Sequence, residues 1–416
     1  MFLGSGVRLS RRTGRRPAAG GLPVRSGAKA FIAVGREALL RRFMSKPTCR
    51  WGILGAANIA RKNWQAIRDA GNASLVAVAS RDLGRAQAFV GECQVDAPHP
   101  HQPLAIEGYE ALLARPDIDA VYIPLPTGVR TEWAVRAAEA GKHVLAEKPA
   151  GCSAAEVRKI ITACARNRVQ YMDGVMFMHS RRLQRLRTVL DDGASVGSIR
   201  HIASQFSYAG DDDFFATVAR THGVLEPLGC LGDLGWYCIR LPLWALGEQL
   251  PLQVTGRICS ATPAASGNAA VPLEFSGELF FAGGVSASFH CSFTAHNAQW
   301  AMISGSRGLL QLTDFVIPFA GSHTRFGVDQ SEFELKNCQF NMREKRFQEQ
   351  IEEPANNAPG SQEAALFRDF SECVLTGRID PRWPEMTLNT QRVLDACLWS
   401  ARHGSAPTAL GNLASH

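Results

Sequence analysis

Lys148 has the sequence setting of an amine that transfers protons. It lies between Glu147 and Pro149, directly after the short apolar run at 143–146. If that run is a strand of a parallel sheet, Lys148 stands at the carboxyl edge, where α/β sheets bind nucleotide cofactors. A lysine placed there can donate or accept a proton in a reaction at the cofactor's ring. The tripeptide alone is common on protein surfaces, so its meaning depends on the other motifs of the chain.

The turn before the first predicted helix is a candidate phosphate site. It reads Gly55-x-Ala57-x-x-Ala60. Backbone N–H groups at a helix start bind phosphate, and small residues allow the ligand to approach closely. Alanine replaces two of the three glycines of a dinucleotide-binding turn, so an ordinary strand-to-helix turn is the alternative. Asn58 and Ile59 open the helix, and Asn58 is predicted either to cap it or to contact phosphate.

The end of the second predicted strand distinguishes between the two nicotinamide cofactors. NAD enzymes usually place an acidic residue there, which binds the 2′-hydroxyl of the ribose. This chain has Ser80 and Arg81, and a guanidinium offers a rigid fork of donors for a 2′-phosphate. The sequence therefore favours NADP, with NAD as the alternative because Asp82 follows. A solvated arginine at the start of a helix is the other interpretation.

A loop bounded by prolines ends the strand predicted from residue 119. Pro124 and Pro126 precede Thr127, and prolines stop a central strand because they cannot donate to the ladder. Such a loop would hold its backbone close to a bound ring. A rigid loop with no ligand is the alternative.

The second half of the chain supplies an acid and a phenol four residues apart. Asp233 and Tyr237 lie in a glycine-rich stretch at 229–237, and one helical turn would put both on the same face. Together with Lys148 they would form a proton-transfer group around a substrate hydroxyl. A glycine-rich loop that Asp233 caps is the alternative.

These residues need a scaffold, and the first part of the chain predicts one of alternating strands and helices. Short apolar runs predict strands, and amphipathic runs predict helices. The helix expected from residue 153 has Ser153 as its N-cap, with Glu156 three residues later as the capping-box partner. The strands are expected at 51–54, 75–79, 119–123, 144–146 and 169–172, and the helices at 59–70, 83–93, 109–115, 131–140 and from 153. Short connections imply right-handed crossovers and a doubly wound parallel sheet.

After about residue 175 the pattern becomes that of an antiparallel sheet with one buried face. A helix is expected at 182–190, strands at 199–208, 253–260, 274–281, 285–293, 300–304 and 309–316, and final helices at 362–375 and 388–402. Residues 279–285 are predicted to form a hairpin. Residues 320–360 are polar and poorly patterned, and they are predicted to be loops.

The positive charge of the chain is concentrated at its beginning. Residues 1–48 hold eleven Lys or Arg and one acid, a charge of +10, so the remainder carries 34 basic and 37 acidic groups, or −3. The body therefore gives no electrostatic reason to expect nucleic acid. The Arg-rich, acid-poor leader predicts an organellar transit peptide, with mitochondrion and plastid both open. The alternatives are a disordered extension, or an upstream start codon with Met44 as the true start; the protein would then be cytoplasmic.

Cysteine, histidine and apolar content exclude several classes of protein. Eleven scattered cysteines with no secretory signal predict reduced, mostly buried thiols. His99 and His101 lack a Cys or acidic partner, so we expect a solvated loop and no metal site. No apolar run is long enough to cross a membrane.

In order and spacing, these motifs resemble the Gfo/Idh/MocA oxidoreductase family. The matching features are 52–62, Ser80-Arg81, 124–127, 147–149, 172–174 and 232–237. The likeness covers roughly residues 49–405. Within the family it is strongest to the dimeric dihydrodiol dehydrogenase and D-xylose dehydrogenase branch and its uncharacterised plant-type relatives.

The resemblance implies a Rossmann domain at 49–175 and a C-terminal α/β domain at 176–405. The second domain would contain a large, mostly antiparallel open sheet that joins subunits into a homodimer or tetramer, and the last helices would pack back on the first. The implied reaction is hydride transfer between NADP, or NAD, and a sugar, polyol or trans-dihydrodiol carbon. The implied cofactor contacts are Gly55, Ala57, Asn58, Ile59, Ser80, Arg81, Pro124, Pro126, Thr127, Glu147 and Lys148.

By the same resemblance, Lys148 matches the catalytic lysine, Asp233 the family's acid, and Tyr237 the position where the dihydrodiol branch carries Tyr. Arg130 stands where relatives often carry His, and 179–182 replaces a His-Asn-Pro-Arg sequence; both sites are expected to line the pocket. Two functions therefore stay open. One is an NADP-dependent dehydrogenase or reductase, and the other is a non-catalytic dinucleotide-binding regulatory protein on the same fold.

Overall fold

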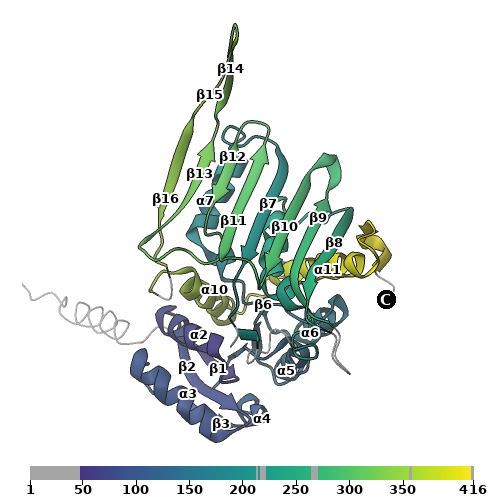
Figure 1. The fold of residues 1–416 in the computed structure, drawn as a ribbon. Helices are drawn as coiled ribbons and strands as arrows, with labels where there is room; N and C mark the ends of the chain where they lie inside the picture. Colours follow the sequence, from purple (N-terminus) through teal and green to yellow (C-terminus); the bar gives the residue numbers. More distant parts are fainter. Residues whose placement is uncertain (1–46, 212–213, 216–221, 264–269, 356–357, 414–416) are drawn as a thin grey trace, which may run out of the picture. The chain divides into compact units, whose positions relative to one another are not determined.

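The computed structural model describes residues 47–211, 214–215, 222–263, 270–355 and 358–413. The targeting prediction for residues 1–48 falls almost entirely outside these ranges. Within them, two sheets organise the molecule (Figure 1). The first is the predicted parallel sheet, which has six strands, and the second is the predicted, mostly antiparallel sheet.

The first sheet has the strand order β3-β2-β1-β4-β5-β6, which confirms the doubly wound arrangement. Its strands are β1 (Cys49–Leu54), β2 (Ala73–Ser80), β3 (Leu104–Glu107), β4 (Ala120–Ile123), β5 (His143–Ala146) and β6 (Tyr171–Asp173). Every residue of β4 and β6 is buried, as expected for parallel strands covered on both faces. The sequence analysis did not predict β3, a partly exposed edge strand whose four residues show little apolar pattern.

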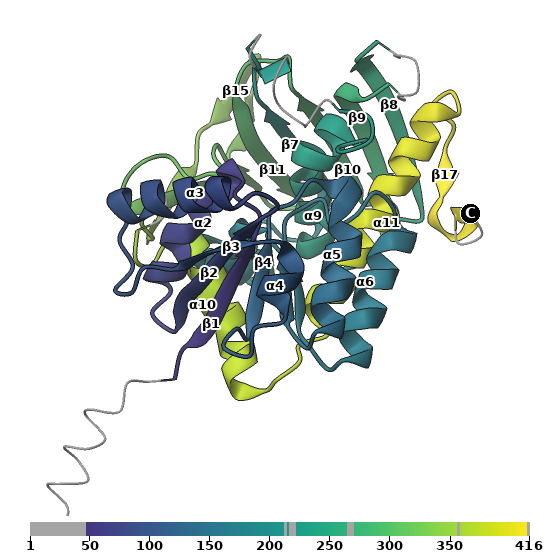
Figure 2. The same cartoon turned by 90° about the horizontal axis from the view of Figure 1, so that it is seen from below.

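Five helices connect these strands. They are α2 (Asn58–Asp69), α3 (Leu83–Asp96), α4 (Tyr109–Leu113), α5 (Thr127–Glu139) and α6 (Ala154–Arg166). Figure 2 shows α5 and α6 side by side on one face of the sheet. Ser153 caps α6 as predicted, because its Oγ accepts a hydrogen bond from the N–H of Glu156. Helix α5 begins at Thr127 instead of residue 131, since a distant carboxylate, Glu226, accepts the N–H of Thr127.

The second sheet has nine strands in the order β16-β13-β12-β11-β7-β10-β9-β8-β17. Strands β7 and β10 are its one parallel pair. The strands are β7 (Ile199–Ser207), β8 (Gln253–Ala261), β9 (Pro272–Phe280), β10 (Ser286–Ser292), β11 (Ala298–Gly305), β12 (Leu309–Leu312), β13 (His323–Asp329), β16 (Arg346–Glu352) and β17 (Thr408–Ala409). The predicted hairpin is confirmed, with the turn η4 (Ala282–Gly284) between β9 and β10.

One face of this sheet, the inner face, packs on helices. Its buried side chains include Phe206, Phe275, Phe289 and Cys291. The helices in contact with it are α7 (Arg181–Asp191), the π-helical turn η3 (Leu231–Gly235), α9 (Trp236–Ala245) and α11 (Arg382–Arg402). The opposite face, called the outer face here, alternates with these residues and carries polar side chains such as His201 and Ser288.

The prediction of loops at 320–360 is wrong. This stretch contains β13 and β16 and, between them, a separate two-stranded hairpin of β14 (Glu332–Lys336) and β15 (Gln339–Arg343). High overall polarity concealed a period of two, which is the usual signal of a strand. In β13, for example, Thr324, Phe326 and Val328 are buried and their neighbours are not.

The C-terminal helices return to the first sheet. Helix α10 (Gln362–Thr376) packs against α2 and β1. The Trp51 ring of β1 lies 5.0 Å from the Phe367 ring and 5.1 Å from the Phe370 ring, measured between centroids. Its indole N–H donates to Ser371 Oγ at 3.0 Å. Helix α10 therefore contributes directly to the core around the first sheet.

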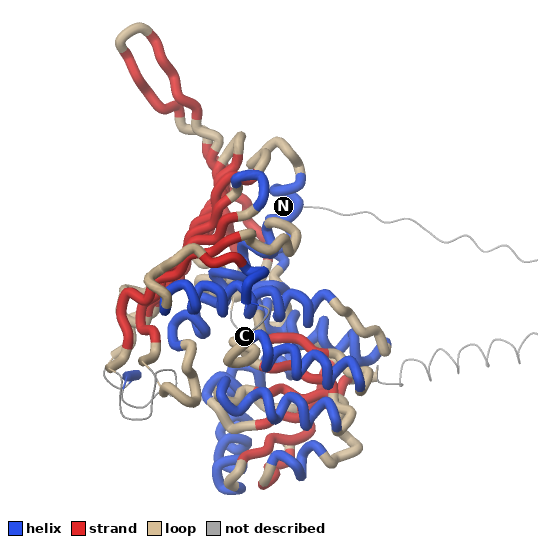
Figure 3. Tube along the Cα trace, turned by 90° about the vertical axis from the view of Figure 1, so that its right-hand side faces the viewer, coloured by secondary structure: helices blue, strands red, loops and turns tan. Residues whose placement is uncertain are grey.

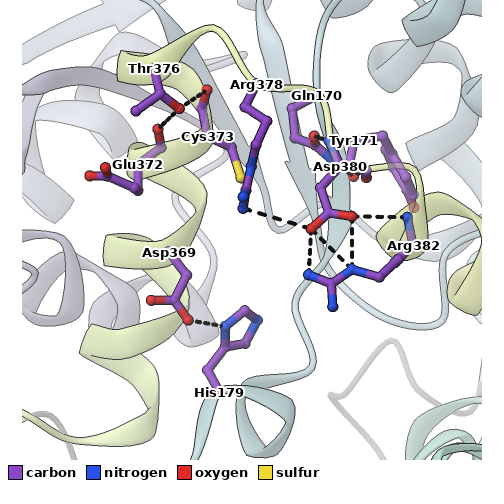
Figure 4. A network of polar contacts seen from close by, with 10 residues as sticks. All are labelled: Gln170, Tyr171, His179, Asp369, Glu372, Cys373, Thr376, Arg378, Asp380 and Arg382. Carbon is purple, nitrogen blue, oxygen red and sulfur yellow. Dashed lines mark hydrogen bonds and ion pairs between the residues drawn. The ribbon is translucent and has the colours of Figure 1, made fainter.

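A polar network reinforces this return (Figure 4). His179, in the 3-10 turn η1 (Met176–His179), places its Nδ1 2.8 Å from Asp369 of α10. Gln170, just before β6, accepts the N–H of Asp380 and donates to its carbonyl. These bonds fix the segment between α10 and α11 against β6. The short turn η5 (Leu410–Leu413) then ends the described chain.

Candidate functional site

The glycine turn leads from β1 into a helix start that no side chain caps. Gly55 has φ 122°, a conformation that glycine adopts easily and other residues avoid. Its N–H donates to the carbonyl of Ala79 at 2.8 Å. Ala57 is the N-cap of α2, and the first turn holds no acid. Such a helix start attracts phosphate. Asn58 is the first helical residue and is exposed, and Ile59 beside it is half-buried.

The carboxyl end of β2 presents two arginines. Ser80 is buried and Arg81 is exposed. The Asp82 carboxylate is engaged as the N-cap of α3, where it accepts the N–H of Arg85 at 2.7 Å. Burial raises the pKa of the Tyr109 phenol, and the positive charges of Arg81 and Arg85 oppose that rise, which places both guanidinium groups near the phenol. A hydroxyl and two guanidinium groups form a donor set that suits a 2′-phosphate.

The proline-bounded loop is held from the second domain. Pro124 is buried and Pro126 is half-buried. The Thr127 hydroxyl donates to Glu226 Oε2 at 2.5 Å, and the Thr127 N–H donates to Oε1 at 3.0 Å. The side chain of Thr127 is therefore engaged by Glu226.

Glu147 and Lys148 point in different directions. Glu147 is buried, where its Oε1 accepts the Tyr122 phenol at 2.5 Å and the Asn63 amide at 3.4 Å. Burial, followed by the charge of Glu147, raises the pKa of Tyr122 well above its usual value. Glu147 therefore anchors the end of β5 to β4 and α2. Lys148 follows and is joined to Pro149 by a cis peptide bond.

The predicted proton-transfer group is assembled. Lys148 Nζ forms an ion pair with the Asp233 carboxylate and donates to the Asp233 carbonyl at 2.8 Å. The same ammonium lies 4.8 Å from the centroid of the Tyr237 ring, a cation–π distance. The Tyr237 hydroxyl lies 3.7 Å from Met176 Sδ. Since the Lys148 and Asp233 side chains are only 11% and 13% exposed, the amine is held in one place at the edge of the sheet.

The turn that carries Asp233 is a π-helix, a form that often marks functional sites. Gly232 in this turn packs against the lysine loop. A Cβ at residue 232 would lie 2.6 Å from Leu228 Cβ and 3.1 Å from Pro149 Cγ. A side chain here would clash with Leu228 of the same domain and press on Pro149, so the glycine lets this turn lie close to the lysine loop, where Asp233 meets Lys148.

Two further groups position the loops. Arg130, expected to line the pocket, is buried and donates to the carbonyls of Leu125 and Pro149. It therefore ties the proline loop to the lysine loop. His179 stacks on Trp383 with ring centroids 4.7 Å apart, so it stabilises the C-terminal return described above. Neither role could be deduced from local sequence, because each partner depends on the tertiary fold.

Elsewhere in the described residues, histidines and cysteines have structural surroundings. His99 is buried against Trp64, with its Nε2 3.1 Å from the Trp64 carbonyl, so the prediction of a solvated loop is wrong for this residue. Among the described residues, no group of three or more His, Cys, Asp or Glu is arranged to hold a metal ion. None of the helices in the described ranges combines the length and apolar character needed to cross a bilayer. All eleven cysteines are free thiols.

Comparison with known proteins identifies the class. Residues 49–175 match the model of an oxidoreductase family with an NAD-binding Rossmann fold, and residues 183–311 match the GFO/IDH/MocA C-terminal domain. The chain belongs to the Gfo/Idh/MocA family of NAD(P)-dependent oxidoreductases.

Several members of this family are similar in sequence to the chain. A dTDP-3,4-didehydro-2,6-dideoxy-alpha-D-glucose 3-reductase from Saccharopolyspora spinosa is 34% identical over 64% of this chain and 74% of its own. A D-xylose 1-dehydrogenase (NADP(+)) from Haloferax volcanii is 28% identical over 86% and 98%. A trans-1,2-dihydrobenzene-1,2-diol dehydrogenase from Bos taurus is 29% identical over 64% and 74%.

A solved structure is similar to this chain over most of its length. The 3-ketoreductase from Actinomadura kijaniata, in complex with NADP, superposes with a TM-score of 0.66 and 26% identity. The match covers 86% of this chain and 97% of that one. The similarity therefore extends over both domains.

Proposed function

We propose that this protein is an NADP-dependent oxidoreductase acting on a sugar, polyol or diol. The observation that carries the proposal is the Lys148 ammonium, fixed by Asp233 and by the face of the Tyr237 ring at the carboxyl edge of the nucleotide-binding sheet. When bound, the nicotinamide supplies hydride transfer at its C4 carbon. The residues of this chain then have to bind and orient the substrate and handle its hydroxyl proton.

Lys148 is the group proposed to move that proton. In the oxidation direction its neutral amine accepts the hydroxyl proton as the carbon loses hydride, and in reduction the ammonium returns a proton to the forming alkoxide. Asp233 contacts the amine through both its carboxylate and its backbone carbonyl. These two contacts fix the position of Nζ. The Tyr237 ring covers one side of the amine, and its phenol is the second candidate for the proton.

The cofactor preference is proposed from the arginines after β2. Arg81 directly follows β2, where a Rossmann site binds the ribose 2′-position, Arg85 lies in the first turn of α3, and Asp82 is engaged in capping that helix. The Haloferax relative is named as NADP-dependent, and the Actinomadura structure contains NADP. The substrate class is proposed from the relatives, which act on deoxysugar nucleotides, xylose and a dihydrodiol.

A cofactor-fluorescence screen of sugars, polyols and diols tests this function. With an active substrate, Lys148→Ala should lower kcat by about 10²–10⁴-fold, the usual range for a general acid or base, while NADPH binding stays intact. Lys159→Ala, an exposed lysine of α6, is the matched control. NADPH binding with no turnover of any substrate class would favour the regulatory alternative.

The leader and the assembly complete the proposal. We infer that the +10 leader directs the protein to an organelle, which a fluorescent fusion of residues 1–48 would test by co-localisation with mitochondrial and plastid markers.

We also infer a homodimer or tetramer formed through the outer face of the nine-stranded sheet. The support is the burial pattern of the sheet: in β7 and β10 the residues of the outer face are only partly buried, while those of the inner face are buried.

A further inference from the structure

A hairpin projects from one edge of the nine-stranded sheet (Figure 3). It consists of β14, β15 and the turn at 337–338, and is called the arm here. Its register continues that of the sheet without a slip. Asp329 pairs with Arg346 in the sheet, and Glu332 pairs with Arg343 in the arm. Between them, the N–H of Gln330 donates to the carbonyl of Lys345 at 2.8 Å. The arm is therefore an extension of the strand pair β13–β16.

One side of the arm is entirely apolar. Phe333 is paired with Met342, and Leu335 is paired with Phe340. Their exposed fractions are 62%, 65%, 57% and 68%, in the order named. The two phenyl rings are in contact, with centroids 5.9 Å apart. Contiguous exposed apolar patches mark interaction surfaces, and an isolated two-stranded hairpin is at best marginally stable in water.

The other side of the arm is charged and internally paired. Arg343 forms ion pairs with Glu332 and Glu334. Counting Lys336, the arm carries two carboxylates and two cations, a net charge of zero. It therefore lacks the excess of basic residues that draws a protein to an anionic membrane surface. We therefore expect the apolar side of the arm to bind a protein surface.

The apolar side shares the orientation of the outer face. Because pairing continues without a slip, Phe333 and Leu335 have the same alternation phase as Arg325 and Asp329, opposite to the buried Phe326. The outer face also contains a recess of about 510 Å³, bordered by Arg257, Glu278, His290 and Trp300. A projection and a recess thus lie on one face of the molecule.

We propose that the arm packs its apolar side on a second copy of this chain. A two-fold pair uses the same surface of both copies, so each arm can reach over the outer face of the other. Four large apolar side chains from each copy then add a hydrophobic contact to the sheet surface. This inference rests on the proposed assembly through the outer face and assigns the arm as its main source of affinity.

Sedimentation equilibrium of the full chain over a concentration series tests the arm. Phe333→Ser combined with Phe340→Ser should raise the dimer dissociation constant by about 100-fold or more, because a few buried apolar anchors carry most of the binding energy of an interface. Glu334→Gln with Asn341→Ser, on the opposite side of the same hairpin, is the matched control and should leave the constant unchanged. Circular dichroism verifies that all variants are folded.

The outcomes separate the two proposals. A wild-type chain that stays monomeric at every concentration overturns both the assembly and the role of the arm. A dimer that Phe333→Ser with Phe340→Ser leaves equally tight overturns only the role of the arm. Binding of wild type to neutral or anionic vesicles, lost in the same variant, would assign the apolar side to a membrane instead.

A photo-cross-linker on the arm's tip gives a second measurement. Cys338 lies at the tip and is exposed, and Cys259→Ser removes the other exposed thiol. Benzophenone maleimide on Cys338 should yield covalent dimers with the link in the partner's nine-stranded sheet. Links confined to residues of the same chain would contradict the proposal.

Discussion

Asp173 and Arg240 form an ion pair in which both side chains are completely buried, with Nη2 2.7 Å from Oδ2. Asp173 ends β6, beside the end of the strand that precedes Lys148, and Arg240 belongs to α9, the helix of Tyr237. Trp236 Nε1 donates to the same carboxylate at 3.0 Å, and Arg240 Nε donates to Thr390 Oγ1 at 2.7 Å. The pair therefore links the two elements whose separation sets the geometry of the candidate site.

Removing one member of this pair should strongly destabilise the protein. Arg240→Met leaves the Asp173 carboxylate buried without its cation, and we expect the free energy of unfolding to fall by about 3–5 kcal/mol. Adding Asp173→Asn removes the orphaned charge, so the double variant should recover part of that loss. Denaturant unfolding of the two single variants and the double variant measures both effects. Additive losses in the double variant would show that the two side chains are not coupled.

Arg81→Ala tests the choice of cofactor. If the guanidinium binds a 2′-phosphate, NADP should bind about 10–100-fold more weakly, as expected for loss of a charged hydrogen bond. NAD affinity should change by less than about 2-fold, because NAD lacks that phosphate. Calorimetric titration of both cofactors gives the comparison, with Arg166→Ala, an exposed arginine of α6, as control. An equal loss for both cofactors would contradict a role at the 2′-phosphate.

Tyr237→Phe separates the phenol from the ring. The substitution keeps the aromatic face that Lys148 contacts at 4.8 Å and removes only the hydroxyl. If Lys148 handles the proton, kcat should fall by less than about 10-fold, far less than in Lys148→Ala. The measurement is a pH–rate profile of both variants on one substrate from the screen. A larger loss in Tyr237→Phe than in Lys148→Ala would transfer the role to the phenol.

Asp395 predicts a pH dependence of stability. Burial raises its pKa to about 6, and its carboxylate accepts the N–H of Ala154 at the start of α6 at 2.7 Å. The folded state therefore holds a proton that the unfolded state has lost between about pH 4 and 6. Its contribution to stability is present below pH 4 and is lost as the pH rises through 6.

Asp395→Asn should abolish that contribution and flatten the stability curve in the same window. The amide keeps an acceptor for Ala154 and has no proton to lose, so we expect a gain of about 1–3 kcal/mol at pH 7 relative to wild type. Denaturant unfolding at a series of pH values measures it. Parallel curves for the two proteins between pH 4 and 7 would show that Asp395 does not titrate as described.

Local signals were sufficient for most of the scaffold. The apolar strand Ala120–Ile123 and the capping pair of Ser153 and Glu156 are adjacent in sequence, so pattern and turn chemistry locate them. The start of α5 was missed because Glu226, which satisfies Thr127, is 99 residues away in the chain. The arm was missed because its alternating Phe333 and Leu335 lie among charges that were interpreted as a loop.

The sequence by itself determined where Lys148 lies along the chain: directly after a buried strand, with a small-residue turn upstream and an acid and a phenol in the second domain. Only the tertiary structure decided what each side chain touches. Adjacent residues of an extended segment point to opposite sides, so Glu147 turns inward to Tyr122 while Lys148 meets Asp233, 85 residues further on. Such contacts depend on how two domains pack, here through Gly232 against Pro149, and short-range sequence patterns carry no record of that packing.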